Sequence, residues 1–286
     1  RVLLYNGRYA AAAAAAKAVM DLGVYSLYAD YYNLFQQEGD YSTEDIISYI
    51  HVKETKPNGL RDIAGINSVC GGTLYLNPLP SLVDDYESAN GYYPYTSDPA
   101  YDVHAPYKNR DPRLGASIFY PGSILPNNKV YDPINNALDK IGGDKATYTG
   151  YAFKKIFDRT ELEIRDNGGN DWKIMRYAEE LLTYAEAANE AGGPSADVIN
   201  ALDLVRARAH MPGVNETFAL NNWTLNQAAL RTFIRHERRI ELAGEGHRYF
   251  DILRWKTGQQ VLNGPVYTLD ASQGLSDIET TKGKTN

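Results

Sequence analysis

Tyrosine is the residue type in this 286-residue chain that most clearly suggests a chemical role, because it occurs 23 times against 7 phenylalanines and 3 tryptophans. A tyrosine ring offers an apolar face and a polar tip. Several tyrosines fall in one stretch among glycines, prolines and acidic residues: Tyr86, Tyr92, Tyr93, Tyr95, Tyr101 and Tyr107. Such rings stack on the apolar faces of sugars, while carboxylates and amides bind the hydroxyl groups.

The tyrosine-rich stretch allows two interpretations, which the residues alone leave open. In the first, the rings bind a ligand, and the candidates are Tyr92, Tyr93 and Tyr95, followed by Tyr86 and the upstream Tyr75. A flexible glycine and a rigid proline beside the first three rings present aromatic faces at low entropy cost. In the second, the rings attach a long irregular loop to the body of the protein.

The densest cluster of acidic and basic side chains lies near the C-terminus and consists of Glu237, Arg238, Glu241, Arg248, Asp251 and Arg254. A carboxylate pair there could act as general acid and base. The alternation of acids and bases favours a buried ion-pair network, because unpaired buried charge is costly and arginine can bridge two carboxylates. We therefore predict that the cluster is structural and joins the last two helices.

Residues 166–171 read DNGGND and supply hard oxygen donors on a flexible loop. Asp166, Asn170 and Asp171 are therefore candidate Ca²⁺ ligands. The run lacks the spacing of an EF-hand loop, and aspartate just before a helix is an ordinary cap. Apart from this calcium, the sequence implies no cofactor.

Carboxylate pairs such as Asp84/Asp85 and Asp98/Asp102 could serve a glycoside hydrolase, but nothing distinguishes them among 36 acidic residues. The chain has no P-loop, no G-x-S-x-G turn and no H-E-x-x-H motif. Its net charge of −7 argues against a nucleic-acid partner. No apolar run approaches the ~20 residues that span a bilayer. Cys70 is the single cysteine, so no internal disulfide is expected.

The elements that must position these residues fall into three zones. We expect residues 1–50 to be mainly helical, starting with an alanine-rich helix over 8–22 and interrupted by a turn-rich stretch over 25–41. Within this zone, 43–50 could begin a helix or form a short buried strand. Residues 51–169 contain most of the prolines, so we expect a long irregular region on the ligand side. Residues 170–258 are predicted to be helical.

Apolar residues at helical spacing define the helices of the third zone. The first stripe comprises Ile174, Tyr177, Ala178, Leu181, Leu182, Ala185 and Ala188. Gly192-Gly193-Pro194 ends this helix, and Ser195 can cap the next, whose stripe comprises Ile199, Leu202, Val205 and Ala209. The two helices predict an antiparallel hairpin of ~40 residues, the size of a tetratricopeptide unit. Thr224 and Gln227 match a capping box before a last helix pair within 224–256.

Residues 235–255, RHERRIELAGEGHRYFDILRW, resemble the C-terminal signature of the SusD/RagB family, E-R-x-x-E-L-x-x-E-G-x-R-x-x-D-L-x-R-W. The signature residues carried here include Glu237, Arg238, Glu241, Arg248, Asp251, Arg254 and Trp255; they mark the fold and receive no ligand role. Three further segments resemble the family, namely 109–114, 176–187 and 205–212. The resemblance covers nearly the whole chain.

The resemblance implies one mainly α domain over residues 1–286, with a SusD-like scaffold of tetratricopeptide-like helix pairs and an irregular ligand-binding side. It implies a non-catalytic outer-membrane lipoprotein of Bacteroidetes that captures glycans at the cell surface and delivers them to a SusC-like TonB-dependent transporter. Peptide cargo is the alternative, and a glycoside hydrolase is the third.

Family members are longer at the N-terminus, where a signal peptide and a lipid anchor lie. We therefore expect this chain to be the C-terminal part of such a protein, attached to the membrane only through that anchor. Part of the ligand site would then lie outside this sequence. The polar residues 280–286 are expected to form a loose tail.

Overall fold

The structure is a computed structural model that describes residues 1–269 and 284–285. Within these residues, helix is the main regular secondary structure, as expected from the sequence. The helices are α1 (Val2–Tyr5), α2 (Tyr9–Asp21), α3 (Leu60–Ala64), α4 (Asn67–Cys70), α5 (Pro80–Asp85), α6 (Pro112–Ser117), α7 (Tyr177–Gly192), α8 (Ala196–Arg208), α9 (Val214–Leu220), α10 (Gln227–Glu241), α11 (Arg248–Trp255) and α12 (Gly258–Leu262). The strands are β1 (Asp45–Tyr49), β2 (Ile118–Phe119), β3 (Ala152–Phe153), β4 (Trp172–Arg176), β5 (Tyr267–Thr268) and β6 (Lys284–Thr285).

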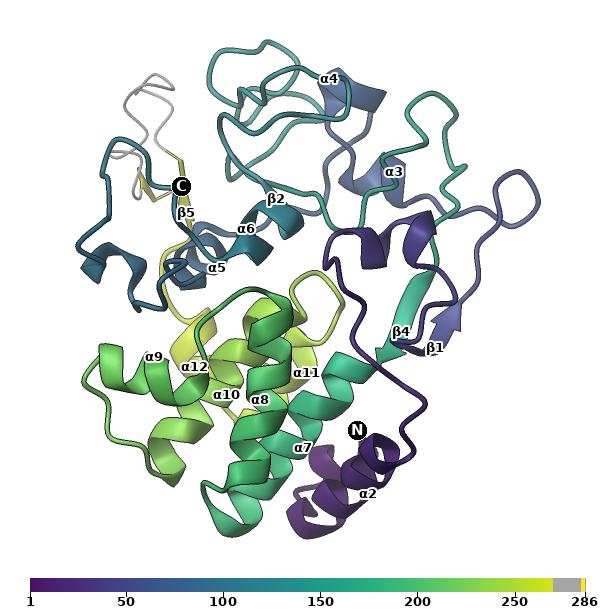
Figure 1. The fold of residues 1–286 in the computed structure, drawn as a ribbon. Coiled ribbons are helices and arrows are strands. Elements are labelled where there is room, and N and C mark those ends of the chain that lie inside the picture. Colours follow the sequence, from purple (N-terminus) through teal and green to yellow (C-terminus); the bar gives the residue numbers. More distant parts are fainter. Residues whose placement is uncertain (270–283, 286) are drawn as a thin grey trace.

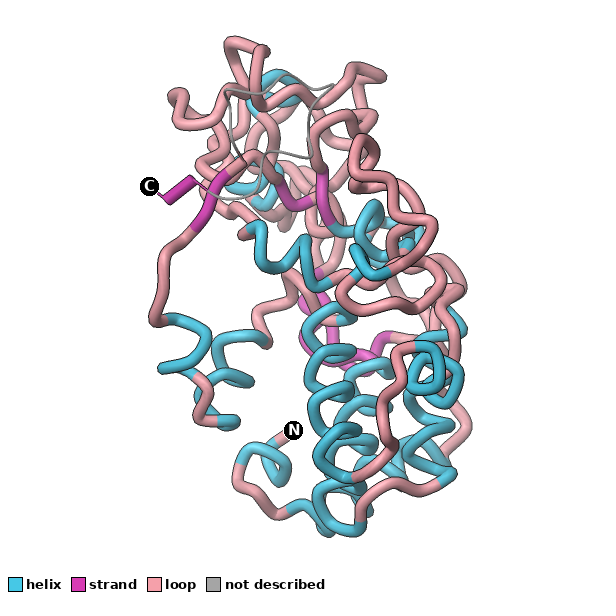
Figure 2. Tube along the Cα trace, turned by 90° about the vertical axis from the view of Figure 1, so that its left-hand side faces the viewer, coloured by secondary structure: helices cyan, strands magenta, loops and turns pink. Residues whose placement is uncertain are grey.

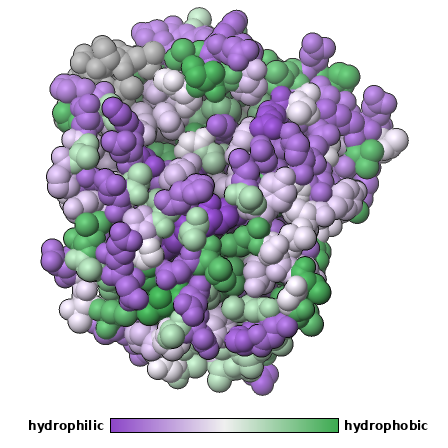
Figure 3. Space-filling view, viewed as in Figure 1, coloured by the Kyte–Doolittle hydropathy of each residue, from purple (hydrophilic) through white to green (hydrophobic). Residues whose placement is uncertain are grey.

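The long helices and the irregular chain gather in opposite halves of the molecule (Figures 1 and 2). The helical half contains α2 and α7–α12, and the loop half contains most of residues 51–169 with the short helices α3–α6. Mostly hydrophilic residues cover the loop half in the view of Figure 3. The strands form three separate two-stranded ladders, in which β1 pairs with β4, β2 with β3 and β5 with β6, all antiparallel.

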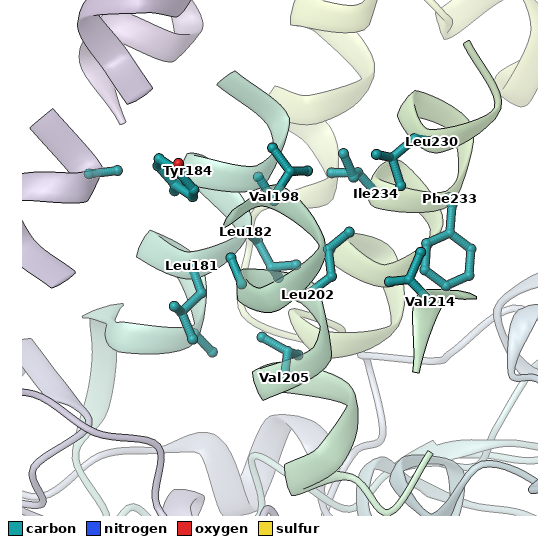
Figure 4. Packing of buried hydrophobic residues seen from close by; sticks show 14 of the residues in the cluster. Leu181, Leu182, Tyr184, Val198, Leu202, Val205, Val214, Leu230, Phe233 and Ile234 are labelled. Atoms are coloured by element: carbon teal, nitrogen blue, oxygen red, sulfur yellow. The ribbon is translucent and has the colours of Figure 1, made fainter. Parts of the chain in front are cut away.

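One hydrophobic core joins α2, α7, α8, α9 and α10 of the helical half (Figure 4). Leu181 and Leu182 of α7 and Leu202 of α8 are fully buried there, as the helical spacing predicted. The Ser195 hydroxyl accepts a hydrogen bond from the Val198 N–H at 3.3 Å, so it caps α8 as predicted. The helix pair α7–α8 therefore forms as expected, while its kinship to tetratricopeptide repeats stays a prediction.

The segment before α7 is a strand, and the prediction of helix from residue 170 is wrong over its first residues. Residues 172–176 form β4, so Ile174 lies in a strand and is 38% exposed instead of facing the helical core. Their backbone groups bond to β1, which resolves residues 43–50 as a strand that is half exposed, not buried. The expectation that residues 1–50 are mainly helical is also wrong, because α2 ends at Asp21; the 3₁₀ turns and loops that follow agree with the turn-rich stretch expected over 25–41.

The start of α10 differs from the predicted capping box. Asn226 is the cap, and its Oδ1 accepts hydrogen bonds from the Ala228 and Ala229 N–H groups, each at 3.0 Å. Asparagine is at least as favourable as threonine at this position, which explains the shift of two residues from Thr224. The sequence reading also missed α9, whose seven residues are too few to show a clear apolar stripe.

The loop half has its own small hydrophobic cores, and side chains hydrogen-bond to many of its backbone groups. Tyr86, Leu114 and Ile118 are buried in one cluster of this half. Asn77 shows how loops are joined, since its Oδ1 accepts from the Thr147 hydroxyl at 2.8 Å and from a backbone N–H at 2.7 Å. The predicted loose tail over 280–286 falls almost wholly outside the described residues.

Candidate functional site

An open groove of about 650 Å³ lies where the loop half meets the helical half. One wall is formed by the loop over 89–100, and the other by the turn between α8 and α9 together with α9 itself. Its lining residues are Ala89, Asn90, Tyr92, Asp98, Pro99, Ala100, His210, Met211, Pro212, Glu216 and Leu220. The size is that of a small-molecule site, and the lining combines one ring, apolar surface and a few polar groups.

Hydrogen bonds and one glycine fix the loop wall of the groove. Ser88 and Tyr92 are joined twice, from the Ser88 N–H to the Tyr92 carbonyl and from the Tyr92 N–H to the Ser88 hydroxyl, both at 3.1 Å. Asn221 donates to the Gly91 carbonyl at 2.8 Å, which ties the loop to the end of α9. Gly91 has φ +89°, and a Cβ there would lie 3.2 Å from Cγ of Pro212. The close approach of the two walls therefore requires a glycine.

Two of the three adjacent candidate tyrosines attach the loop to the body. The Tyr93 hydroxyl donates to Asp85 at 3.1 Å, and its ring lies 4.5 Å from that of His236 on α10. The Tyr95 hydroxyl donates to Asp84 at 3.2 Å, and the ring is only 4% exposed beneath the Arg110 guanidinium. Burial first, and the nearby carboxylates second, raise the pKa of both hydroxyls to about 12.

Tyr92 differs from these two neighbours. It is half-buried and lines the groove. Among the described residues, its hydroxyl has no hydrogen-bond partner and its ring contacts no other aromatic ring. Of the three rings, Tyr92 is therefore the one whose face and hydroxyl can meet a ligand.

The two remaining candidate tyrosines, Tyr86 and Tyr75, differ widely in solvent exposure. Tyr86 is 0% exposed in the core of the loop half, so its prediction as a ligand residue is wrong: its ring is surrounded by Leu114 and Ile118. Tyr75 is 74% exposed, outside the groove. The structure thus does not bring the predicted tyrosines together on one face, and the ring face of Tyr75 stands apart from that of Tyr92.

The carboxylates proposed for hydrolysis are engaged in other contacts. Asp84 and Asp85 accept the hydroxyl hydrogen bonds of the two attaching tyrosines. Asp98 accepts from the Ala100 N–H at 2.8 Å and from the Asn90 amide at 3.0 Å. Asp102 accepts from a backbone N–H and is absent from the groove lining. Of these four, only Asp98 lines the groove.

The candidate calcium ligands have divergent surroundings. Asp166 is exposed, whereas Asn170 donates to the Phe35 carbonyl at 3.1 Å and Asp171 accepts from the His51 N–H at 2.8 Å. Both buried residues precede β4, so the alternative that they cap a helix is wrong. Within the described ranges, no three His, Cys, Asp or Glu side chains are grouped to hold a metal ion. The calcium site stays a prediction.

Glu237 and Glu241 of α10 form the centre of a buried ionic network. Glu237 is 1% exposed and contacts Arg206 at 2.8 Å. Glu241 is 0% exposed, and its carboxylate pairs with Arg113, Arg176 and Arg208. Burial raises the pKa of each carboxyl, but the arginines outweigh it and hold both pKa values below the ordinary range. The buried ion-pair network predicted from the alternating charges is therefore present, while its purely structural role stays a prediction.

The network continues from α10 to α11. Arg238 donates to Asp251 at 2.8 Å, and Asp251 accepts from Arg254 at the same distance. Arg254 then pairs with Glu186 of α7, which also accepts from the Trp255 indole N–H at 2.7 Å. Arginine–carboxylate ion pairs and one indole hydrogen bond thus attach α11 to α7 and α10.

Arg248 corrects one part of the prediction, because it is partly exposed and makes no ion pair with the described residues. The arginines that pair with the carboxylates of α10 were not predicted from the sequence, because they come from outside the signature. Arg113, Arg176 and Arg206 each lie in one of the other segments that resemble the family. The resemblance of these segments to the same family was the signal that could have predicted that their arginines lie close to α10.

The comparisons with known proteins agree with this arrangement. The model of the SusD family matches residues 23–281. This chain therefore belongs to the SusD family. In the part of the chain that the structure describes, no helix is long and apolar enough to cross a membrane.

Two relatives show the extent of the similarity. The SusD-like protein P2 of Formosa agariphila is 44% identical over 92 residues, which are 32% of this chain and 18% of that protein. The crystal structure of a SusD-like carbohydrate binding protein from Bacteroides fragilis superposes with a TM-score of 0.83 at 30% identity, covering 94% of this chain and 52% of the other. The chain thus spans about half the length of this solved relative.

A more distant structure shares the fold. Surface glycan-binding protein A from Bacteroides thetaiotaomicron, solved in complex with laminarihexaose, gives a TM-score of 0.55 at 22% identity, covering 96% of this chain and 55% of that one.

Proposed function

We propose that this chain is part of a non-catalytic receptor that captures oligosaccharides at the cell surface and passes them to a SusC-like TonB-dependent outer-membrane transporter. The observation that carries the proposal is the groove beside Tyr92 in a chain of the SusD family. A carbohydrate-binding relative at 30% identity supports the ligand class. Among more distant relatives, one surface glycan-binding protein was solved in complex with laminarihexaose, and another is a laminarin binding SusD-like protein.

The chemistry of the groove supports carbohydrate capture. The exposed part of the Tyr92 ring can stack on the apolar face of a sugar. The Asn90 amide and the Asp98 carboxylate lie in the same lining and can hydrogen-bond to hydroxyl groups. Met211 and Pro212 complete an apolar wall opposite the loop. This mixture of ring, amide and carboxylate suits a neutral polyhydroxylated ligand.

The engaged carboxylates support a receptor without turnover. Hydrolysis of a glycosidic bond requires two carboxyl groups that face each other across the bond, about 5–10 Å apart. Among the described residues, Asp98 and Glu216 are the two carboxylates that line the groove, and Asp98 is held by two hydrogen bonds from its own loop. We infer that these groups bind and do not cleave.

A screen of oligosaccharides and peptides tests the proposal. The wild-type protein, Tyr92→Ala and the exposed control Tyr41→Ala are applied to arrays of both ligand classes, and each retained saccharide is then incubated and analysed by mass spectrometry. We expect wild type and Tyr41→Ala to retain saccharides intact and Tyr92→Ala to retain them weakly. Retention of peptides alone would overturn the carbohydrate assignment, and shortened saccharides would overturn the absence of catalysis.

A further inference from the structure

We propose that the Tyr92 groove selects uncharged or amine-bearing sugars and rejects sugars that carry carboxylate or sulfate groups. This selectivity rests on the proposed carbohydrate-binding function. It is carried by the charges of the lining: among the described residues, Asp98 and Glu216 line the groove and no lysine or arginine does. His210 also lines the groove and is exposed, and Tyr92 completes its titratable groups among the described residues.

Asp98 is built into the groove as a fixed negative charge. Its residue is 6% exposed, and its two carboxylate oxygens accept from the Ala100 N–H at 2.8 Å and from the Asn90 amide at 3.0 Å. Burial raises the pKa of this carboxyl, but hydrogen bonds from Ser88, Ala100 and Asn90 outweigh it and lower the pKa. Because each oxygen has two lone pairs, the carboxylate can still accept from a ligand hydroxyl or ammonium group.

The cations near the groove do not offset this charge at its surface. Arg206 lies behind the helical wall, is 0% exposed and is paired with Glu87 and Glu237. Arg110, nearby in the loop half, donates to the backbone carbonyls of Val83, Tyr86 and Pro106 and covers the Tyr95 ring. Neither residue lines the groove. Among the described residues, an anionic ligand would therefore meet two carboxylates and no lysine or arginine in the lining.

The size of the effect follows from Coulomb's law. At a distance of about 6 Å and an effective dielectric constant of about 40, between that of water and that of a protein surface, repulsion by one groove carboxylate weakens the binding of a ligand carboxylate about tenfold. Because the groove is open to solvent, added salt screens this repulsion. An ammonium group at the same place is attracted by a similar amount. We therefore expect a preference for neutral and amino sugars over acidic sugars that is strong at low salt and weak at high salt.

The test uses an array that contains neutral, amino, uronic-acid and sulfated oligosaccharides, probed with the wild-type protein in about 20 mM and about 500 mM salt. We expect neutral and amino sugars to be retained and acidic sugars to be retained at least tenfold less at low salt. The C6-oxidised derivative of a retained neutral hexasaccharide provides a matched anionic probe. Its affinity relative to the parent is measured by calorimetry for wild type, Asp98→Asn, Glu216→Gln and the control Asp102→Asn, which lies outside the groove.

Three outcomes decide the matter. The proposal predicts that Glu216→Gln or Asp98→Asn reduces the discrimination several-fold, while Asp102→Asn leaves it unchanged. Equal or tighter binding of acidic sugars at low salt, or discrimination that both groove variants leave intact, overturns the charge selectivity alone. If no saccharide of any charge binds, the proposed function fails and the selectivity fails with it. Glu216 is exposed, so its variant folds independently of the packing around Asp98.

Discussion

The ionic network of α10 and the tyrosine-rich loop both combine rings with charged groups, yet they differ in what is left unpaired. In the network, Glu237 and Glu241 are at most 1% exposed and each contacts more than one arginine. In the loop, Tyr92 is only half-buried and keeps a hydroxyl without a partner among the described residues. The contrast teaches that chemical richness alone does not identify a site: paired and buried groups hold the fold, and unpaired groups beside a groove can bind.

Removing a central carboxylate of the network is expected to have the largest effect. Glu241→Ala leaves Arg113, Arg176 and Arg208 with a buried charge that has lost a partner. We expect a loss of about 3–5 kcal/mol in the free energy of unfolding. Chemical denaturation of the variant and of the exposed control Glu163→Ala measures it. Full stability with lost ligand affinity would move Glu241 from the scaffold to the site.

The same network predicts how stability depends on pH. Arginine and lysine neighbours outweigh burial and lower the pKa of Glu245 from its ordinary value of 4.5 to about 2. A carboxyl with a lowered folded-state pKa stabilises the fold above its unfolded pKa, and this contribution is lost as pH falls from about 4.5 to 2. The free energy of unfolding, measured by urea denaturation at several pH values across this range, should fall less steeply with decreasing pH for Glu245→Gln than for wild type. The same pH dependence in both proteins would contradict the pairing of Glu245 with Arg176.

A pair of glycine variants distinguishes the effect of groove shape on saccharide binding from the effect of backbone strain on stability. Gly91 and Gly122 both have φ near +90°, but of the two only Gly91 has neighbours within 4 Å of where a Cβ would lie, namely Pro212 and Thr217. Alanine at either site should cost about 1–2 kcal/mol in stability. Only Gly91→Ala should also weaken saccharide binding, because it displaces a groove wall. Equal affinity of the two variants in calorimetry would show that the wall at Gly91 does not shape the site.

The sequence predicted the helical half well because its elements are encoded locally. The spacing of Leu181, Leu202 and Ile234 specifies which faces are buried, and Ser195 marks the start of α8. The resemblance to the family rested on charged residues that the structure places in one network. By contrast, the strand at Ile174 depends on pairing with residues about 130 positions earlier in the chain, which no local pattern reveals.

The groove was predictable only in part. Its tyrosine-rich wall was indicated by composition, but the difference between Tyr92 and Tyr86 depends on tertiary packing that spacing does not encode. Rings in an irregular loop follow no fixed period, so which ones face inward cannot be read from the sequence. The second wall, at Met211 and Glu216, was missed because α9 carries no motif.

Calorimetric titration of a neutral oligosaccharide into Tyr92→Ala and Tyr41→Ala, with wild type for reference, tests the central claim most directly. Both tyrosines are accessible to solvent, but only Tyr92 lines the groove. Loss of one stacking ring should weaken binding by about 1 kcal/mol, or about fivefold, without lowering the melting temperature. The account predicts this loss for Tyr92→Ala and unchanged affinity for Tyr41→Ala. Wild-type affinity in the Tyr92→Ala protein would contradict it and place the carbohydrate site elsewhere.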